Sequence, residues 1–273
     1  MIGQYRYRVR FGGCPMPKRK TVFYRRLSGL MPLLLLLLCW IYFSCRVHND
    51  LLLPGPSRVW RAGLALWHDG RLWTDLFVSM GRVGLGFLMA VTVGLPLGLL
   101  AGRSPGFAAV SRDLLNFLRQ IPPVALIPLF ILWLGLGEAP KVLVIFYASF
   151  FPILLSSESG ARQVDLHLIE VGRLYRLRGF AMLRTIVLPS ALPSVITGMR
   201  LGLGYGWRSL VIAEMLAASR GLGALIVEAR GYGRTDQILV GILMIGLAGT
   251  LLDLGIKALE RFTPWVERGE KTS

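Results

Sequence analysis

Acidic residues are scarce in this chain, which has 15 Asp and Glu against 31 Lys and Arg in 273 residues. Charged residues of both signs make up only 17 % of the sequence, and hydrophobic residues make up 54 %. A typical soluble domain carries about 25 % charged residues. The charges lie between long apolar runs, and about 20 apolar residues are enough to cross a bilayer. The composition therefore excludes an ordinary soluble domain and predicts an all-α polytopic membrane protein.

Cysteine and histidine are also rare, with three residues of each type. Cys14, Cys39 and Cys45 lack metal-ligand spacing, so we expect neither a disulfide nor a zinc site. No histidine lies within an apolar run, and Asp253 is the only aspartate deep inside one. The phosphate-binding pattern G-x-x-x-x-G-K-[ST] does not occur. We therefore expect no catalytic residue, no metal site and no ATP site in this chain.

The net charge of +16 does not indicate nucleic-acid binding, because the basic residues flank apolar runs rather than a soluble domain with a groove. Basic flanks hold loops on the cytoplasmic side of a membrane. Most Lys and Arg residues fall in the N-terminal tail (1–26), the loops 103–119 and 158–189, and the C-terminal tail (261–273). This distribution predicts that both termini are cytoplasmic.

The apolar runs predict six spanning helices, near residues 27–45, 76–102, 120–136, 140–157, 192–218 and 236–259. The last five form a membrane core over 76–260, which contains the cytoplasmic segment 158–190. The first run follows a basic tail, as in a signal peptide. No small-residue cleavage site comes after it, so we expect an uncleaved helix. Met16, followed by Pro-Lys-Arg-Lys, is an alternative start of translation.

Residues 46–75 separate the first two runs and are expected to be an external loop. Tryptophans alternate with arginines in it, a pattern that suits a helix lying in the membrane interface. An ordinary loop with scattered aromatic residues is an equal alternative.

Two of the expected spans carry small residues at intervals of four: Gly86, Ala90, Gly94, Gly98 and Gly102 in one, and Gly198, Gly202 and Gly206 in the other. Residues four apart share a helix face. Small residues on one face allow the backbones of neighbouring helices to approach closely in lipid. We predict tight helix packing along both stripes, with a substrate-lining role as the alternative.

Arg82, Arg208 and Glu214 are charged residues within or near the ends of expected spans. Such residues are costly in lipid and usually face protein or a water-filled path. One interpretation is that they line a passage for an anionic solute. The other is that Arg82 and Glu214 lie near the external interface and pair with each other.

The segment 168–189 is basic and amphipathic and lies between two apolar runs. A helix is predicted over 163–178, with its apolar residues near one face: Leu166, Ile169, Leu174 and Leu177. Such a helix could rest on anionic lipid. It could also act as a lever that fits a groove on a cytoplasmic partner.

Glu170-Val171-Gly172, followed by Ile186-Val187-Leu188-Pro189, resembles the EAA signature of ABC-importer permeases. In that family the signature forms coupling helices that enter a cleft of the ATP-binding subunit. Further stretches over 53–260 resemble, in the same order, those of permeases for sulfonates, taurine and nitrate. They are 53–56, 94–98, 119–128, 133–138, 213–217 and 221–223.

The resemblance implies the type I ABC-importer permease fold in a bacterial inner membrane. It also implies a homodimer with two ATP-binding subunits, which hold ATP and magnesium, and an external or periplasmic solute-binding protein. The residues expected to couple this chain to the ATP-binding subunit are Glu170, Val171, Gly172, Arg176, Ile186, Leu188 and Pro189. A self-contained channel or ion-coupled carrier is the alternative function, although it leaves the 168–189 segment unexplained.

Arg176 occupies the position where the signature usually has glycine. Glycine would permit a turn there, and arginine does not adopt a positive φ cheaply. We therefore expect either that the turn has moved, to Gly172 or Gly179, or that the chain stays helical at Arg176. Coupling is expected to survive, because Glu170 and the Ile-x-Leu-Pro end are intact.

Overall fold

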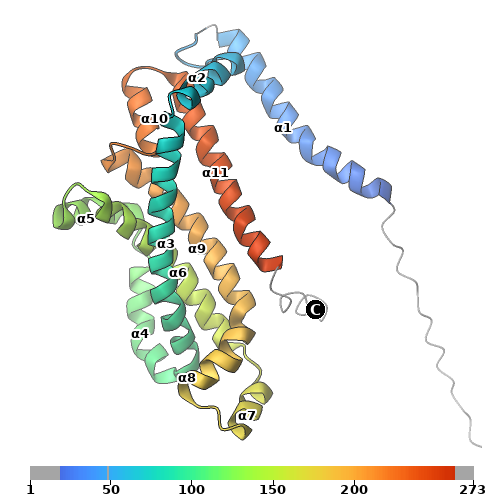
Figure 1. Ribbon diagram of the computed structural model, residues 1–273, viewed down its shortest axis with the longest axis vertical. Coiled ribbons are helices and arrows are strands. Elements are labelled where there is room, and N and C mark those ends of the chain that lie inside the picture. Colours follow the sequence, from blue (N-terminus) through green and yellow to red (C-terminus); the bar gives the residue numbers. More distant parts are fainter. Residues whose placement is uncertain (1–18, 48, 262–273) are drawn as a thin grey trace, which may run out of the picture. The chain divides into compact units, whose positions relative to one another are not determined.

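The computed structural model describes residues 19–47 and 49–261, and these residues form helices and connecting loops without any strand (Figure 1). They fall into two compact units, which divide between Pro56 and Ser57. The first unit contains α1 (Arg19–Val47), which includes the first expected span. Trp40 Nε1 donates a hydrogen bond to the Pro54 carbonyl at 3.1 Å, so the chain after α1 folds back beside that helix.

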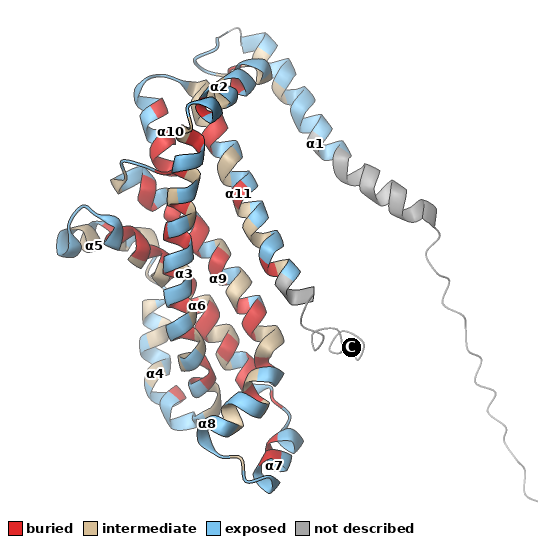
Figure 2. Cartoon of the chain, in the orientation of Figure 1, coloured by how far each residue is buried: buried red, intermediate tan, exposed pale blue. Residues whose placement is uncertain are grey.

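The second unit contains all the other helices: α2 (Pro56–His68), α3 (Arg71–Arg103), α4 (Pro105–Leu118), the 3₁₀ turn η1 (Pro123–Leu126), α5 (Ile127–Leu134), α6 (Glu138–Arg162), α7 (Leu166–Leu174), α8 (Gly179–Met182), the π-helical turn η2 (Leu183–Val187), α9 (Leu188–Ala217), α10 (Leu222–Gly231) and α11 (Thr235–Arg261). The helices α3, α6 and α9 pack side by side as the centre of this unit (Figure 1). Buried residues concentrate where these three helices face one another (Figure 2).

Both stripes of small residues lie against α6, which is sandwiched between α3 and α9. A Cβ atom on Gly86 would lie 2.7 Å from the Ile145 Cβ, and one on Gly102 would lie 2.6 Å from the Ala161 Cβ. On the other side, a Cβ atom on Gly202 would lie 2.8 Å from the Ser149 carbonyl oxygen. The same close approach to α6 is found for the other glycines of the stripes, Gly94, Gly98, Gly198 and Gly206, while Ala90 is fully buried. No larger side chain would fit at the tightest of these positions without moving a backbone.

Four helices of the described part of the chain are long and apolar enough to cross a membrane: α3, α6, α11 over 235–258, and the continuous helix 179–217 formed by α8, η2 and α9. The pair α4 and η1–α5 could be a fifth, broken span, because its halves meet at an angle of 81°. In α1, the described apolar part is Leu34–Val47, which is shorter than a span.

Three expectations from the sequence are wrong in detail. The run 120–136 is not a span of its own, because its helical part, η1 and α5, covers only residues 123–134 and passes as a span only together with α4. Residues 103–119 are mostly helix α4, not a loop: Ser104 Oγ caps it by accepting a hydrogen bond from the Phe107 amide, and Pro105 suits its first turn. No helix was predicted between the last two expected spans, yet residues 219–235 contain the helix α10.

The segment 46–75 also contains a helix, α2, which begins at Pro56. Its buried Val59 and Leu66 face the rest of the second unit, and Gly63 lies close to Val240 of α11. Trp60 and Trp67 are exposed on the other side. The segment is therefore helical rather than an ordinary loop, and its location in the membrane interface stays a prediction.

Candidate coupling segment and buried charge cluster

The helix α7 begins at a capped end. Asp165 precedes it and accepts a hydrogen bond from the His167 amide through Oδ1, at 2.9 Å. Only Ile169 and Gly172 of α7 are buried, whereas Leu166 and Leu174 are 71 % and 83 % exposed. Two of the four apolar residues expected near one face are therefore not packed against the protein, and they are accessible to lipid or to a partner, as both interpretations of the segment require.

Gly172 brings the two halves of the signature together. A Cβ atom on Gly172 would lie 2.5 Å from the Ile186 Cδ1 and 2.8 Å from the Met182 Sδ. The small residue thus lets α7 rest directly on the turn that contains Ile186. Val187, next to Ile186, is 1 % exposed, so this turn is anchored in the protein core.

Arg176 ends α7 in the left-handed conformation, with φ 58°, and is the only non-glycine residue with positive φ in the described part of the chain. The amide of Arg176 donates to the Arg173 carbonyl and the amide of Leu177 donates to the Gly172 carbonyl, both at 2.9 Å. These two bonds define a Schellman C-cap with Arg176 at the position that favours glycine. The expectation that the turn moves, or that the chain stays helical here, is wrong: arginine itself adopts the turn.

The other signature residues lie on two surfaces. Glu170 and Val171 are exposed on the outer side of α7, where a partner could reach them. Leu188 is half-buried and Pro189 is exposed at the start of α9. Between these two surfaces, η2 is a π-helical turn, and α8, η2 and α9 form one continuous helix. The segment that follows α7 is therefore joined to a membrane-length helix without an intervening loop.

A cluster of buried charges lies at the opposite end of the bundle from α7, beside α10 (Figure 1). Arg82 of α3 donates through Nη1 to Glu214 of α9 at 2.7 Å, and through Nη2 to Glu138 of α6 at 2.7 Å. Lys141 also donates to Glu138, at 2.9 Å. Glu214 is 1 % exposed and Arg82 is 6 % exposed, whereas Glu138 reaches solvent. Three membrane-length helices are thus joined through one guanidinium group.

The same cluster holds the start of α10. The Gly223 amide donates to Glu214 at 2.9 Å, the Leu222 amide donates to Ser79 Oγ at 3.0 Å, and the Gly221 amide donates to Asp75 at 3.0 Å. Side chains of α3 and α9 therefore satisfy the amides that a helix leaves unpaired at its N-terminus. A negative charge is also favoured there by the helix dipole.

A second ion pair joins α3 to α10. Arg71 at the start of α3 pairs with Glu228, and its hydrogen bond lowers the pKa of the Glu228 carboxyl. This pair lies at the surface, so its contribution to stability is small. It keeps α10 attached to α3 at a second point.

Of the three charged residues singled out in the sequence, Arg82 and Glu214 pair with each other, as one of the two interpretations held. Arg208 lies elsewhere, exposed on α9, with its guanidinium 5.8 Å from the centre of the Tyr205 ring. It lines a groove of about 720 Å³ between α9 and α11, together with Trp207 and the paired Arg200 and Asp253. The three residues therefore do not form one site.

Sequence reasoning missed Asp75, Ser79 and Glu138, which complete the cluster. Each has a partner in the cluster that lies far along the chain; Ser79 and Glu214, for example, are 135 residues apart. The sequence does offer one signal: the glycines at 221 and 223 flank the start of α10. A side chain at Gly221, whose φ is 123°, would meet the Glu214 carboxylate.

One pattern in the sequence is typical of hydrolases. Gly102-Arg103-Ser104-Pro105-Gly106 matches G-x-S-x-G, in which a serine nucleophile sits on a turn between a strand and a helix. Here Ser104 joins two helices and caps α4, and the described residues include no strand. The pattern is therefore a helix cap. Among the described residues, no group of three His, Cys, Asp or Glu side chains could hold a metal ion.

These features define a class of protein: a multi-pass membrane protein in which a short helix, α7, packs on the segment that continues into one membrane-length helix. The model of the family "binding-protein-dependent transport system inner membrane component" matches residues 94–263. The chain belongs to this family of ABC-importer permeases.

Similar proteins agree with this assignment. The chain is 36 % identical to the taurine transport system permease protein TauC of Escherichia coli K12, over 85 % of this chain and 86 % of that protein. It is 35 % identical to the putative aliphatic sulfonates transport permease protein SsuC of Bacillus subtilis 168, over 90 % and 88 %. It is 34 % identical to the nitrate import permease protein NrtB of a Synechocystis strain, over 70 % of each chain.

A solved structure shares the fold. A chain of the MetNI methionine ABC transporter, in an inward-facing crystal form, superposes with a TM-score of 0.62 and covers 69 % of this chain and 94 % of that one. The sequence identity is 17 %, so this likeness concerns the fold alone. The fold is that of the type I importer permeases.

Proposed function

We propose that this permease moves a small anionic or organic solute of the sulfonate, taurine or nitrate type into the cytoplasm, driven by ATP hydrolysis on a partner subunit. The observation that carries the proposal is the direct connection between the EAA-like segment and α9. ATP and magnesium bind the partner subunit, and this chain contributes no catalytic residue.

The coupling mechanism follows from the contacts of α7. Glu170 and Val171 offer an exposed surface to the ATP-binding subunit, while Gly172 rests on Ile186. Because η2 continues into α9 without a loop, a displacement of α7 is passed to a spanning helix. ATP binding can change the conformation of the permease only if the partner contacts α7 differently in the two states.

The proposed assembly is a homodimer with two ATP-binding subunits and an external or periplasmic solute-binding protein. One chain supplies one coupling segment and one half of a passage, which supports the two-fold arrangement. The excess of basic residues in both tails and in the α4 and α7 regions supports cytoplasmic termini in the bacterial inner membrane. The buried charge cluster and α10 would then lie on the external side, where a solute-binding protein docks.

Arg208 is the proposed contact for an anionic solute. Its side chain is exposed in the groove between α9 and α11, and it makes no ion pair with any described residue. A guanidinium group presents several donors to the oxygens of a sulfonate or nitrate. Arg82 and Glu214 are instead assigned to holding the helices together.

The test is a pull-down of the tagged full-length protein from native membranes in mild detergent. A stoichiometric ATP-binding subunit is expected, and it should be lost when residues 165–178 are scrambled. The Glu170→Gln variant keeps the fold and should weaken the association, whereas Arg112→Gln on α4 should leave it unchanged. A homo-oligomer without any ATPase in several detergents would favour a self-contained channel or ion-coupled carrier.

In the complete transporter, Arg208→Gln should reduce the rate of solute transport while the amount of assembled complex stays the same. Transport equal to wild type in assembled Arg208→Gln complexes would exclude a passage role for this residue.

A further inference from the structure

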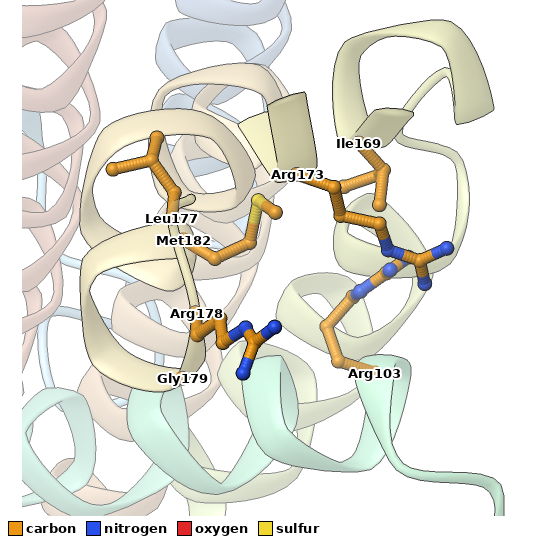
Figure 3. Close-up of a pocket in the computed structure, with 7 residues that line it drawn as sticks. All are labelled: Arg103, Ile169, Arg173, Leu177, Arg178, Gly179 and Met182. Carbon is orange, nitrogen blue, oxygen red and sulfur yellow. The ribbon is translucent and has the colours of Figure 1, made fainter. Parts of the chain in front are cut away.

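Three arginines from three different elements meet at one end of the α3–α6–α9 bundle. Arg103 belongs to the last turn of α3, Arg173 to α7, and Arg178 precedes α8. They line a cavity of about 420 Å³ together with Ile169, Leu177 and Met182. Figure 3 shows their guanidinium groups turned toward the same space.

No acidic side chain lines this cavity. Within the described part of the chain, none of the three guanidinium groups makes a hydrogen bond or ion pair. Other arginines of this region are neutralised: Arg162, for example, pairs with Glu158 at 2.6 Å. Three like charges held around one space repel one another, so an anion between them would remove an unfavourable interaction.

The elements that carry the arginines are fixed in place. Ile169 is 3 % exposed, and the Schellman cap at Arg176 sets the direction of the chain that leads to Arg178. Gly179 then adopts φ 53°, a second left-handed residue within four positions. The two turns bring Arg178 back toward the end of α3 instead of letting it extend away with the loop.

We propose that this cavity binds a phosphate group, either in the headgroup of an anionic phospholipid or as a soluble phosphate. Guanidinium groups bind phosphate oxygens through paired, charge-assisted hydrogen bonds, and three of them can satisfy several oxygens of one phosphate. Arg103 lies in the last turn of α3, whose 33 residues make a helix about 50 Å long. Such a helix exceeds the roughly 30 Å hydrocarbon core, so its end can reach the headgroup region. Basic pockets between spanning helices on the cytoplasmic side are typical sites for anionic lipid headgroups.

The occupant would contact the coupling segment directly. Arg173 is on α7, and Met182 packs against Gly172 as well as lining the cavity. A bound phosphate would therefore tie α7 to the membrane end of α3. The proposal rests on the cytoplasmic orientation of α7 given under the proposed function.

The test uses the full-length protein, purified in neutral detergent and freed of lipid, without any ATP-binding subunit. Native mass spectrometry measures the binding of short-chain phosphatidylglycerol, phosphatidylcholine and inorganic phosphate. The wild type should bind phosphatidylglycerol at least about tenfold more tightly than phosphatidylcholine. Arg103→Gln and Arg178→Gln should each weaken this binding about tenfold, the loss expected for one charge-assisted hydrogen bond.

Two variants serve as controls. Arg112→Gln removes the same charge from neighbouring α4, outside the cavity, and should bind like wild type. Arg178→Lys keeps the charge but loses the planar fork, and should fall between wild type and Arg178→Gln. Thermal unfolding without lipid identifies any variant that fails to fold. If one of Arg103→Gln and Arg178→Gln fails to fold, the lipid binding of the other variant decides whether the site exists.

The outcomes separate the sources of the phosphate. Phosphatidylglycerol binding that inorganic phosphate does not displace supports a lipid headgroup; equal binding of inorganic phosphate at the same arginines supports a soluble source. Unchanged binding in both Gln variants, or an effect as large in Arg112→Gln, overturns the site. The pull-down of the ATP-binding subunit is scored separately, so its failure would refute the proposed function without changing the titration.

Discussion

Replacing Arg82 by methionine should destabilise the protein by about 3–5 kcal/mol, the range for removing one partner of a buried ion pair. Arg82 is 6 % exposed and donates to Glu214, Glu138 and the Arg220 carbonyl, so its loss leaves several acceptors unpaired. The largest cost comes from Glu214, which is 1 % exposed and would keep only Ser79 and the Gly223 amide as donors. Glu138 reaches solvent, so water can replace its lost partner.

A double-mutant cycle isolates the interaction of Arg82 with Glu214. Glu214→Gln removes the charge and keeps the shape, so the pair of changes should cost less than the sum of the two single changes, by more than about 1 kcal/mol. Unfolding of the purified protein in detergent, followed by circular dichroism against denaturant, measures each free-energy difference. Arg112→Met, at an exposed position of α4, is the matched control and should stay within about 0.5 kcal/mol of wild type.

Two results would refute this reasoning. If Arg82→Met unfolded within about 1 kcal/mol of wild type, the cluster would not hold the helices together. If the two single changes added without any coupling, the contact between Arg82 and Glu214 would carry no stabilisation of its own. Transport by a stable Arg82→Met protein would then have to be tested again, because a passage role would return.

Three further predictions concern other parts of the fold. Arg176→Gly should stabilise the protein by about 1 kcal/mol by removing a left-handed arginine, with unchanged ATPase coupling; a sharp rise in transport-coupled ATPase activity would show instead that the arginine impairs coupling. Gly98→Leu should prevent close packing of α3 on α6, because even a Cβ atom there would overlap the Leu154 carbonyl. This variant should fail to elute as a folded species in size-exclusion chromatography. Gly81→Leu, at a position with open space, should elute like wild type. The Arg71–Glu228 pair lowers the pKa of Glu228, so its small stabilisation should be present above the ordinary carboxyl pKa of about 4.3 and be lost as the pH falls through the lowered value. Glu228→Gln should therefore melt at a lower temperature than wild type near neutral pH and at the same temperature in acid. A difference in melting temperature that persists in acid would contradict the ion pair.

The sequence predicted those features that depend on neighbours along one helix. Gly98 and Gly202 could be recognised because a period of four marks a helix face, although only the structure shows that α6 is the element against which both stripes pack. The buried cluster could not be predicted in the same way. Asp75, Ser79 and Glu138 contact residues of other helices, and no local pattern in the sequence specifies such long-range partners.

Two differences from the sequence-based expectations have opposite physical causes: the surroundings override a local preference at Arg176, whereas the local preference of proline prevails at Pro122 and Pro123. Arginine avoids a positive φ, yet Arg176 adopts one because Gly172 must lie against Ile186 and two backbone hydrogen bonds close the turn. The run 120–136, which these prolines interrupt, was expected to be a span of its own. The structure instead bends the chain by 81° between α4 and α5, as proline favours when it cannot continue a helix.

The helix α9 connects the two ends of the proposed mechanism. It has 30 residues, so it is about 45 Å long. At its start, η2 joins it to the segment that would meet the ATP-binding subunit; near its end, Glu214 binds Arg82 and the amide of Gly223. A displacement of α7 that reaches η2 through the contact of Gly172 with Ile186 must therefore either be absorbed by the π-helical turn or change the contacts of Glu214. Because the cluster also holds α10, the second response would move the surface proposed to receive the solute-binding protein.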